Sequence, residues 1–234
     1  MKSIRILITL AVLSLSPYSY ATIYTINASV QGWDVPTPTS PQQSPYANYI
    51  AGCSGGYIFR DFFIFDLSGL GSGSIISATL SIYNPGVSQG DLGNGFLSPH
   101  ANETYQIGSV STPLNILAQG TGGAAVFNDL AAGTLWGAQV VSSSDNGAFV
   151  QIPLNASFLA AAEPDLGTGA IGFGGHLVGD TGFTQNEYIF GFTGTANGPI
   201  PQLRLEVVPV PEPSSLVLGG FLATVCLRRW LRRN

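Results

Sequence analysis

Two segments of the sequence match the G-x-S-x-G pattern of serine hydrolases. They centre on Ser54, in residues 52–56, and on Ser88, in residues 86–90. That chemistry requires the serine on a sharp turn between a strand and a helix, with an acid and a histidine at later positions in the chain. Ser54 is followed by a β-prone run and Ser88 by a glycine-rich loop. Because the chain contains 30 glycines, such matches arise by chance, and neither serine is expected to be a nucleophile.

Residues 167–172 match G-x-G-x-x-G, the pattern of a dinucleotide-binding turn. Such a site needs a strand first, and then glycines that open a helix whose N-terminus receives the pyrophosphate. Here a helix-prone segment precedes the glycines and a β-prone run follows them. The order is reversed, so no dinucleotide site is expected.

Metal ligands are sparse in the sequence. The two histidines, His100 and His176, have no neighbours at the spacing of a zinc site. Oxygen ligands for calcium lie in or beside one long loop: Asp91, Asn94, Asn102 and Glu103. The segment "DLGNG" lacks the dense acid spacing of a calcium loop, and Asp and Asn also favour plain turns. No metal site is therefore assigned, and calcium stays a minor alternative with Asp91, Asn94 and Glu103 as candidate ligands.

Carbohydrate chemistry requires either paired carboxylates or exposed aromatic side chains. A glycosidase places two carboxylates roughly 5–10 Å apart, and none of the acids stands in a recognisable glycosidase motif. Aromatic candidates for a sugar-binding surface are Trp33, Tyr46, Tyr49 and Trp136. Aromatic residues of β-proteins more often fill the core. The sequence thus predicts a protein that is not an enzyme, with a carbohydrate-binding module or a carbohydrate-active enzyme as the alternative.

Charged residues are scarce and unevenly placed. They make up 9% of the chain, and the segment 22–209 holds two basic residues against twelve acids, a formal charge of −10. Nucleic acid is excluded as a partner, because affinity for it depends on basic residues that neutralise phosphates. The same segment contains a single cysteine, Cys53, in a glycine-rich loop. No disulfide can form within it, so a hydrophobic core must stabilise the fold.

The first 21 residues have the layout of a secretory signal peptide. Two basic residues precede an apolar run at 6–15, and small residues stand at positions −3 and −1 of a cleavage point between Ala21 and Thr22. Ten apolar residues are too few to span a bilayer. The sequence predicts export of the protein, with signal peptidase as a transient partner.

The segment 22–209 has the pattern of one all-β domain. Short β-prone runs separated by Gly, Pro and Asn turns predict an antiparallel β-sandwich or jelly roll with one or two short helices. The predicted strands lie at 22–30, 56–67, 75–85, 103–110, 136–153 (two runs), 169–177, 187–194 and 201–208, and the helical segments at 113–120 and 155–165. A signal helix before this domain and an apolar helix after it complete the expected organisation.

Three local patterns are specific enough to test. Residues 56–67 are aromatic or β-branched on both faces, which indicates a strand that is buried on both sides. Alternation in 75–85 places Ile76 on the same face as Ala78, Leu80 and Ile82. Asp145-Asn146-Gly147 between two β-prone runs predicts a tight hairpin.

The stretch 60–84, "RDFFIFDLSGLGSGSIISATLSIYN", resembles the strand–turn–strand of secreted jelly-roll modules of the DNRLRE class. The shared features are a basic residue, an apolar strand that ends in F-D-L, a turn, and "I-x-S-A-T-L-x-I-Y". The resemblance implies a β-sandwich and, more faintly, a sugar ligand. It covers framework strands alone, so it implies no binding residue.

The segment 210–234 combines three features in order. A Val-Pro-Glu-Pro motif is followed by an uncharged apolar run at 214–227 and then by four arginines. The prolines prevent the last strand from continuing. As a helix the run would be about 21 Å long, short of the ~30 Å hydrocarbon core of a bilayer.

This segment resembles the PEP-CTERM sorting signal of bacteria. The residues that carry the resemblance are Val210, Pro211, Glu212, Pro213, Arg228, Arg229, Arg232 and Arg233. The resemblance implies transient membrane insertion, recognition by an exosortase-type enzyme, and delivery of the domain to the cell surface or the exopolysaccharide matrix. A simple C-terminal membrane anchor is the alternative. The sequence as a whole therefore predicts an exported, non-catalytic matrix protein with a structural or weak glycan-interacting role.

Overall fold

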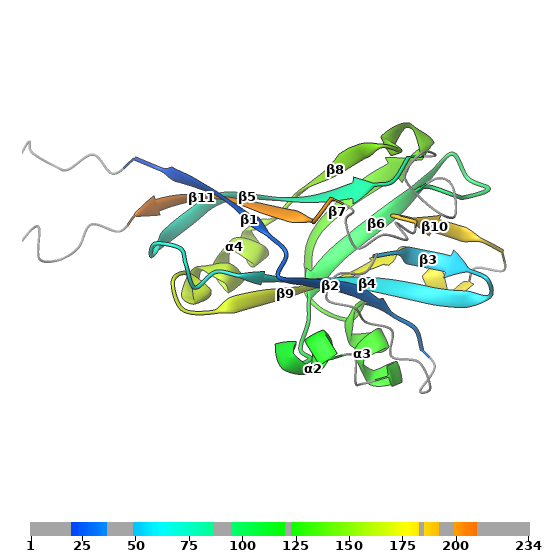
Figure 1. Cartoon of the computed structure of the whole chain (residues 1–234), viewed down its shortest axis with the longest axis horizontal. Helices are drawn as coiled ribbons and strands as arrows, with labels where there is room; N and C mark the ends of the chain where they lie inside the picture. The colour runs from blue at the N-terminus through cyan, green and yellow to red at the C-terminus, as the bar shows by residue number, and fades with distance from the viewer. Residues whose placement is uncertain are drawn as a thin grey trace, which may run out of the picture.

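The computed structural model describes residues 20–36, 49–86, 95–119, 123–182, 185–191 and 199–209. Within these ranges two antiparallel sheets pack face to face, and short helices lie beside them (Figure 1). The four-stranded sheet has the order β1-β11-β5-β8 and consists of β1 (Thr22–Asn27), β5 (Gly73–Asn84), β8 (Ala148–Pro153) and β11 (Gln202–Pro209).

The seven-stranded sheet has the order β10-β3-β4-β9-β6-β7, with β2 paired to β4. Its strands are β2 (Val30–Asp34), β3 (Ala51–Ser54), β4 (Tyr57–Asp66), β6 (Asn102–Ser109), β7 (Leu135–Ser142), β9 (Ala170–Leu177) and β10 (Glu187–Ile189). The helices are α2 (Leu114–Gln119), α3 (Gly123–Asp129) and α4 (Ala156–Ala162), and the 3-10 turns are η1 (Ser143–Asp145), η2 (Glu163–Asp165) and η3 (Asp180–Gly182).

The strand order is that of a jelly roll. When β2, β3 and β10 are set aside and the other eight strands are numbered along the chain, one sheet has the order 1-8-3-6 and the other 2-7-4-5. Most connections therefore cross from one sheet to the other. The all-β sandwich predicted from the sequence is confirmed.

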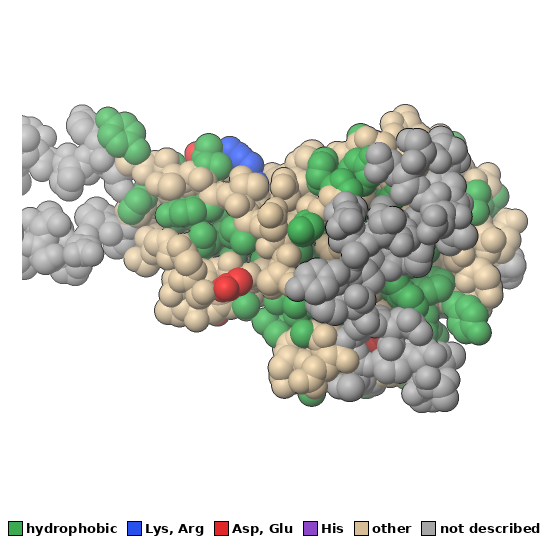
Figure 2. Space-filling view, viewed as in Figure 1, with side chains coloured by type: hydrophobic (Ala, Val, Ile, Leu, Met, Phe, Trp, Pro, Cys, Tyr) green, Lys and Arg blue, Asp and Glu red, His purple; other side chains and the backbone are tan. Residues whose placement is uncertain are grey.

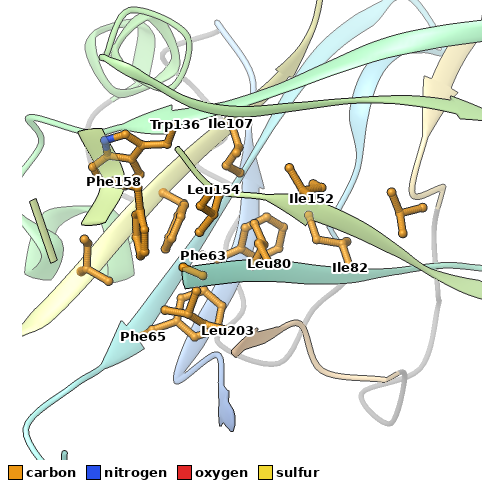
Figure 3. Close-up of a cluster of buried hydrophobic side chains, with 14 of the residues drawn as sticks. Phe63, Phe65, Leu80, Ile82, Ile107, Trp136, Ile152, Leu154, Phe158 and Leu203 are labelled. Atoms are coloured by element: carbon orange, nitrogen blue, oxygen red, sulfur yellow. The ribbon is translucent and has the colours of Figure 1, made fainter. Parts of the chain in front are cut away.

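The main core fills the space between the two sheets. Phe63 and Phe65 of β4 point towards Leu80 and Ile82 of β5, and all four side chains are buried (Figure 3). Aromatic rings close one end of this core: Trp136 packs edge-on against Phe158 of α4 and Phe173 of β9, with ring centroids 5.2 and 5.0 Å apart. Helix α4 begins where the sequence predicted, because the Asn155 side chain accepts hydrogen bonds from the first-turn backbone N–H groups of Ser157 and Phe158.

A second, smaller core lies on the outer face of the seven-stranded sheet. Phe62 and Ile64 of β4 pack there with Leu117, Val126 and Leu130, which come from α2, α3 and the residue after α3. The two helices lie on the side of β4 that faces away from the four-stranded sheet (Figure 1). Strand β4 is thus covered on both faces, as its sequence pattern predicted. Helix α3 was not predicted, because a seven-residue helix with a glycine start depends on this packing for its stability.

Arg60 fixes this outer layer to β4. Its Nε and Nη2 atoms donate to the two carboxylate oxygens of Asp180 in η3, at 2.7 and 3.1 Å, and Nη1 donates to the Phe127 carbonyl at 3.0 Å. The guanidinium carbon also lies 4.1 Å from the centroid of the Phe127 ring. Both charged side chains are at least 90% buried, so the bidentate pair is shielded from water.

Two features of β5, β7 and β8 differ from the sequence predictions. Ile76 is 52% exposed and Ile75 is buried instead, because β5 shifts register against β11 between Glu206 and Val207, which pair with Ser77 and Ile75. This bulge leaves the extra residue on the solvent face.

The runs around residues 145–147 form no hairpin, since β7 pairs with β6 while β8 pairs with β5 of the other sheet.

A tight hairpin lies instead between β3 and β4. Gly55 and Gly56 have φ values of +59° and +82°, the left-handed pair of a two-residue hairpin turn.

Cys53 was predicted in a flexible loop, but it is on β3 and is buried. Predicted strand 22–30 is also divided, since β1 ends at Asn27 and β2 starts at Val30.

The start of β1 and the end of β11 lie at the same end of the sandwich. Thr22 pairs with Val207 in the sheet, and β1 starts and β11 ends towards the left edge of Figure 1. None of the helices in the described ranges is long and apolar enough to cross a membrane. The predicted signal helix and the apolar run at 214–227 lie outside these ranges.

The Arg60–Asp180 pair gives a stability prediction. Asp180→Ala leaves a buried guanidinium without its counter-charge, so we expect the free energy of unfolding to fall by about 3–5 kcal/mol in urea denaturation. Arg204→Ala is the control, because Arg204 is exposed on β11 and should change stability by about 0.5 kcal/mol or less. The double variant Arg60→Met/Asp180→Leu should recover part of the loss. A loss below about 1 kcal/mol for Asp180→Ala would contradict the structural role of the pair.

Candidate functional site

Three ionisable side chains from two distant parts of the chain meet at one place. A ligand-type atom from each of His100, Glu103 and Glu187 lies within 4.8 Å of the other two. Glu103 is the second residue of β6 and Glu187 is the first residue of β10. Glu103 is 8% exposed and Glu187 is 5% exposed. The His100 side chain is 68% exposed. The cluster therefore has a buried acidic floor and a histidine on its solvent side.

The backbone brings these residues together through a bridge between the segment 95–100 and β10. The N–H of Leu97 donates to the Tyr188 carbonyl at 2.9 Å, and the N–H of Tyr188 donates to the Leu97 carbonyl at 2.7 Å. On its other edge β10 pairs with β3, where Glu187 is opposite Cys53. Strand β10 is thus held on both sides. It lies at the end of the sandwich away from the start of β1 and the end of β11 (Figure 1).

Ser98 orders the loop within the cluster. Its hydroxyl donates to Oε1 of Glu103 and accepts a hydrogen bond of 2.9 Å from the backbone N–H of His100. One serine therefore orients the Glu103 carboxylate and sets the position of the His100 backbone. The Nε2 atom of His100 is 3.8 Å from Oε1 of Glu187, too far for a hydrogen bond.

The two glutamates repel each other. Burial, together with the hydrogen bond and the charge of the Glu103 carboxyl, raises the pKa of Glu187 above its ordinary value, while His100 acts in the opposite direction. Within the described ranges the ion pairs are that of Arg60 with Asp180 and, when the imidazole is protonated, that of His100 with Glu187. Two buried carboxylates so close together favour a positive charge beside them.

A second buried polar group lies between the sheets. Oδ1 of Asp61 on β4 accepts a hydrogen bond of 2.7 Å from the Tyr105 hydroxyl, and both residues are fully buried. Oδ2 of Asp61 has no hydrogen-bond partner in the described ranges. Burial raises the pKa of Asp61 to about 7. Gly175 lies opposite Asp61, and a Cβ there would be 1.9 Å from the tyrosine hydroxyl, so only glycine fits. Since it is enclosed by the core, this pair is structural.

A small hollow beside His176 has a volume of about 40 Å³. It is lined by Gln106, Ile107, Gly108, Leu130, Ala131, Gly133, Leu135 and His176. The Nδ1 atom of His176 is buried without a partner in the described ranges, and burial lowers the pKa of this histidine. The hollow is far smaller than the roughly 300 Å³ of the smallest typical small-molecule pockets, so it can hold water but not a sugar.

The hydrolase pattern at Ser54 and the dinucleotide pattern at 167–172 lie in backbone geometry that does not suit either chemistry, as expected from the sequence. Ser54 ends β3 and is followed by the Gly55-Gly56 turn into β4, so it is on no strand-to-helix elbow. Gly167 follows η2, and Gly172 lies inside β9. Ser88 is outside the described residues.

The aromatic candidates for sugar binding are mostly core residues. Trp136 and Tyr49 are 4% and 3% exposed, and Trp33 is half-buried against Phe59, with ring centroids 4.9 Å apart. Tyr46 lies outside the described residues. The exposed ring pair was missed: Phe149 on β8 is 39% exposed and packs edge-on against Tyr83 on β5, with centroids 5.4 Å apart.

Of the three candidate calcium ligands, Glu103 alone is described, and Asp91 and Asn94 lie outside the described residues. Its actual neighbours, His100 and Glu187, were not predicted. His100 is only three positions away, but Glu187 is distant in the sequence and meets Glu103 through the Leu97–Tyr188 bridge. No local sequence pattern predicts that bridge, because it joins residues far apart in the sequence.

The predicted cleavage residues Ala21 and Thr22 are exposed, and β1 begins at Thr22. The eight residues of the predicted sorting signal lie outside the described ranges. No protein-family model matches the chain, and no curated protein matches it either. Its function is therefore inferred from its residues and their geometry.

The raised pKa of Asp61 gives a pH prediction. An acid whose pKa is about 7 in the folded protein, against 3.8 ordinarily, holds its proton more tightly when folded. Its contribution to stability is complete below pH ~4 and is lost as the pH rises to about 7, a change of about 4 kcal/mol. Asp34, whose pKa burial raises to about 6, acts in the same direction.

We therefore expect Asp61→Asn to gain stability relative to the wild type as the pH is raised from 5 to 8. The amide keeps an oxygen that accepts from Tyr105 but cannot ionise. The comparison is made between the two proteins at each pH, because the lowered pKa of His176 opposes the trend in both. Thermal unfolding measures the difference. Parallel curves over this range would show that Asp61 does not titrate there.

Proposed function

We propose that this chain is an exported bacterial protein of the cell surface or the exopolysaccharide matrix, whose β-sandwich acts without catalysis. The observation that carries this proposal is the segment 210–234, with its Val-Pro-Glu-Pro motif, apolar run and four arginines. In this proposal signal peptidase removes residues 1–21, and an exosortase-type enzyme recognises the tail while it is inserted in the membrane. The sandwich then reaches the surface and contributes structure or weak glycan contacts.

The surface of the sandwich supports a role among hydrated neutral polymers. Among the described residues on the face shown in Figure 2, hydrophobic side chains and uncharged groups predominate, and charged side chains are few. Five of the acids are buried, namely Asp34, Asp61, Glu103, Asp180 and Glu187. A surface with so little charge offers hydroxyl and amide groups, which can exchange hydrogen bonds with a polysaccharide without the cost of desolvating ions.

The Tyr83–Phe149 pair is the best-placed group for weak glycan contact. These rings lie on the outer face of β5 and β8, where Tyr83 is directly opposite Phe149. Next to them, the Ser81 hydroxyl donates to the side-chain oxygen of Gln151 at 2.9 Å. Partly exposed rings near polar side chains can stack against a sugar ring. A dedicated carbohydrate-binding module, the alternative function, would use the same surface with higher affinity.

The tail proposal predicts the ends of the mature protein. Mass spectrometry of the protein recovered from the surface of its native cells should find an N-terminus at Thr22 and no peptide beyond about Pro213. Replacing Glu212 and the four arginines by alanine should leave the protein unprocessed and associated with the membrane. An intact "LRRWLRRN" terminus on surface protein would contradict processing and would favour a simple anchor.

The glycan proposal predicts weak binding that depends on one aromatic pair. Purified protein should bind polysaccharide from its own producer with an affinity in the millimolar range. Phe149→Ala should weaken this binding about three- to tenfold, the equivalent of about 0.5–1.5 kcal/mol for one aromatic contact. Tyr57→Ala is the matched control, because Tyr57 is an exposed ring on β4, 55% exposed, in the other sheet.

Calorimetric titration measures both variants against the wild type. Tight, selective binding of one glycan, or any turnover of it, would replace the matrix role by the alternative. Equal losses in both aromatic variants would remove the Tyr83–Phe149 surface from the proposal.

A further inference from the structure

We propose that His100, Glu103 and Glu187 bind one divalent transition-metal ion of the zinc class. Their ligand atoms, one imidazole nitrogen and two carboxylate oxygens, lie within 4.8 Å of one another. They come from the loop before β6, from β6 itself and from β10. The site is independent of the proposed function, because it involves neither the tail nor the outer face of β5 and β8.

The distance between the His100 and Glu187 side chains fits two ligands of one ion better than it fits a direct hydrogen bond. Zinc lies about 2.0–2.2 Å from nitrogen and oxygen ligands, so two of its tetrahedral ligands are about 3.3–3.6 Å apart. Nε2 of His100 and Oε1 of Glu187 are 3.8 Å apart, longer than a hydrogen bond and close to this spacing. The His100 side chain is exposed, so rotation of its ring can bring the nitrogen closer to the two carboxylates.

The buried carboxylates create a demand for positive charge. Glu103 and Glu187 are both more than nine-tenths buried and face each other, and the described ranges bring no arginine into an ion pair with either of them. Carboxylates in such a place are strongly destabilising as free anions. A divalent cation neutralises both at once.

The donor set selects the class of ion. Imidazole nitrogen is a ligand for zinc and its transition-metal neighbours, whereas calcium takes six to eight oxygens. Two buried carboxylates and one histidine supply three protein ligands, which leaves one tetrahedral position open. Ser98 supports the set from outside, since its hydroxyl donates to Glu103 and its oxygen accepts from the His100 backbone.

An ion at this site would join three segments that no disulfide connects. It would tie the loop 95–100 and the start of β6 to β10, next to the Leu97–Tyr188 bridge. The open position is on the side of the exposed His100 and is accessible to water or to a donor atom of another molecule. Binding at a concentration 100-fold above the dissociation constant should raise the unfolding midpoint by roughly 5–10 °C.

The test is metal titration of the full chain, purified without a histidine tag and treated with chelator. Isothermal calorimetry with Zn²⁺ should give one ion per chain, and Co²⁺ should give the visible absorption bands of a tetrahedral site. His100→Ala and Glu187→Gln should each weaken Zn²⁺ binding by roughly 100-fold or more, since outer-sphere partners alone contribute 10–100-fold. His100→Ala changes an exposed side chain, so folding is not at risk.

Two control variants exclude other zinc ligands. His176→Ala removes the second histidine of the chain, and Cys53→Ser removes the buried thiol opposite Glu187. Both should bind Zn²⁺ as the wild type does. Loss of binding in either control, or in neither site variant, would overturn the assignment.

Calcium provides the remaining comparison. Tight Ca²⁺ binding that survives His100→Ala would show an oxygen-only site and overturn the transition-metal proposal. Absence of binding for both ions at 100-fold excess over protein would also overturn it.

Discussion

Strand β4 is covered on both faces, and every side chain of its middle part must therefore find its partners inside the protein. Its apolar residues meet the opposite sheet on one side and helices α2 and α3 on the other. Its two adjacent charged residues have different partners. Arg60 donates hydrogen bonds to the carboxylate of Asp180, whereas Asp61 accepts a hydrogen bond from the hydroxyl of Tyr105. The positions of η3, α3 and Gly175 all follow from satisfying these two groups, because an unpaired charge at this depth would cost several kcal/mol.

Scarcity of cations determines how the other acids are stabilised. Asp129, at the end of α3, accepts hydrogen bonds from the backbone and hydroxyl groups of Ser111 and Thr112, and together these bonds outweigh burial and lower its pKa. Asp145 is held in the same way by Ser142. Neutral donors replace the salt bridges of more highly charged proteins, which keeps these contacts insensitive to ionic strength. At the pair formed by Glu103 and Glu187, Ser98 supplies such a donor to Glu103, but a second carboxylate is buried beside it.

Periodicity and turn chemistry predicted the sandwich, the double burial of β4 and the start of α4, because each depends on residues close together in the sequence. The errors have a different origin. Ile76 faces solvent because of a bulge that involves the partner strand β11, and the β7–β8 connection crosses between sheets because each strand finds a better partner elsewhere. The meeting of Glu103 with Glu187 depends on the Leu97–Tyr188 bridge in the same way. Such pairings are decided by tertiary contacts, which a local pattern does not contain.

The arrangement of β1, β11 and β5 also has a mechanical consequence. Strand β11 lies between two antiparallel neighbours, and its end at Pro209 lies beside the start of β1. A pulling force applied to that end would act along the strand axis. It would load the hydrogen bonds to both neighbours together, in shear, instead of opening them one after another as a zipper does. A domain held at the end of β11 would thus resist extraction by drag or flow with the combined strength of two ladders.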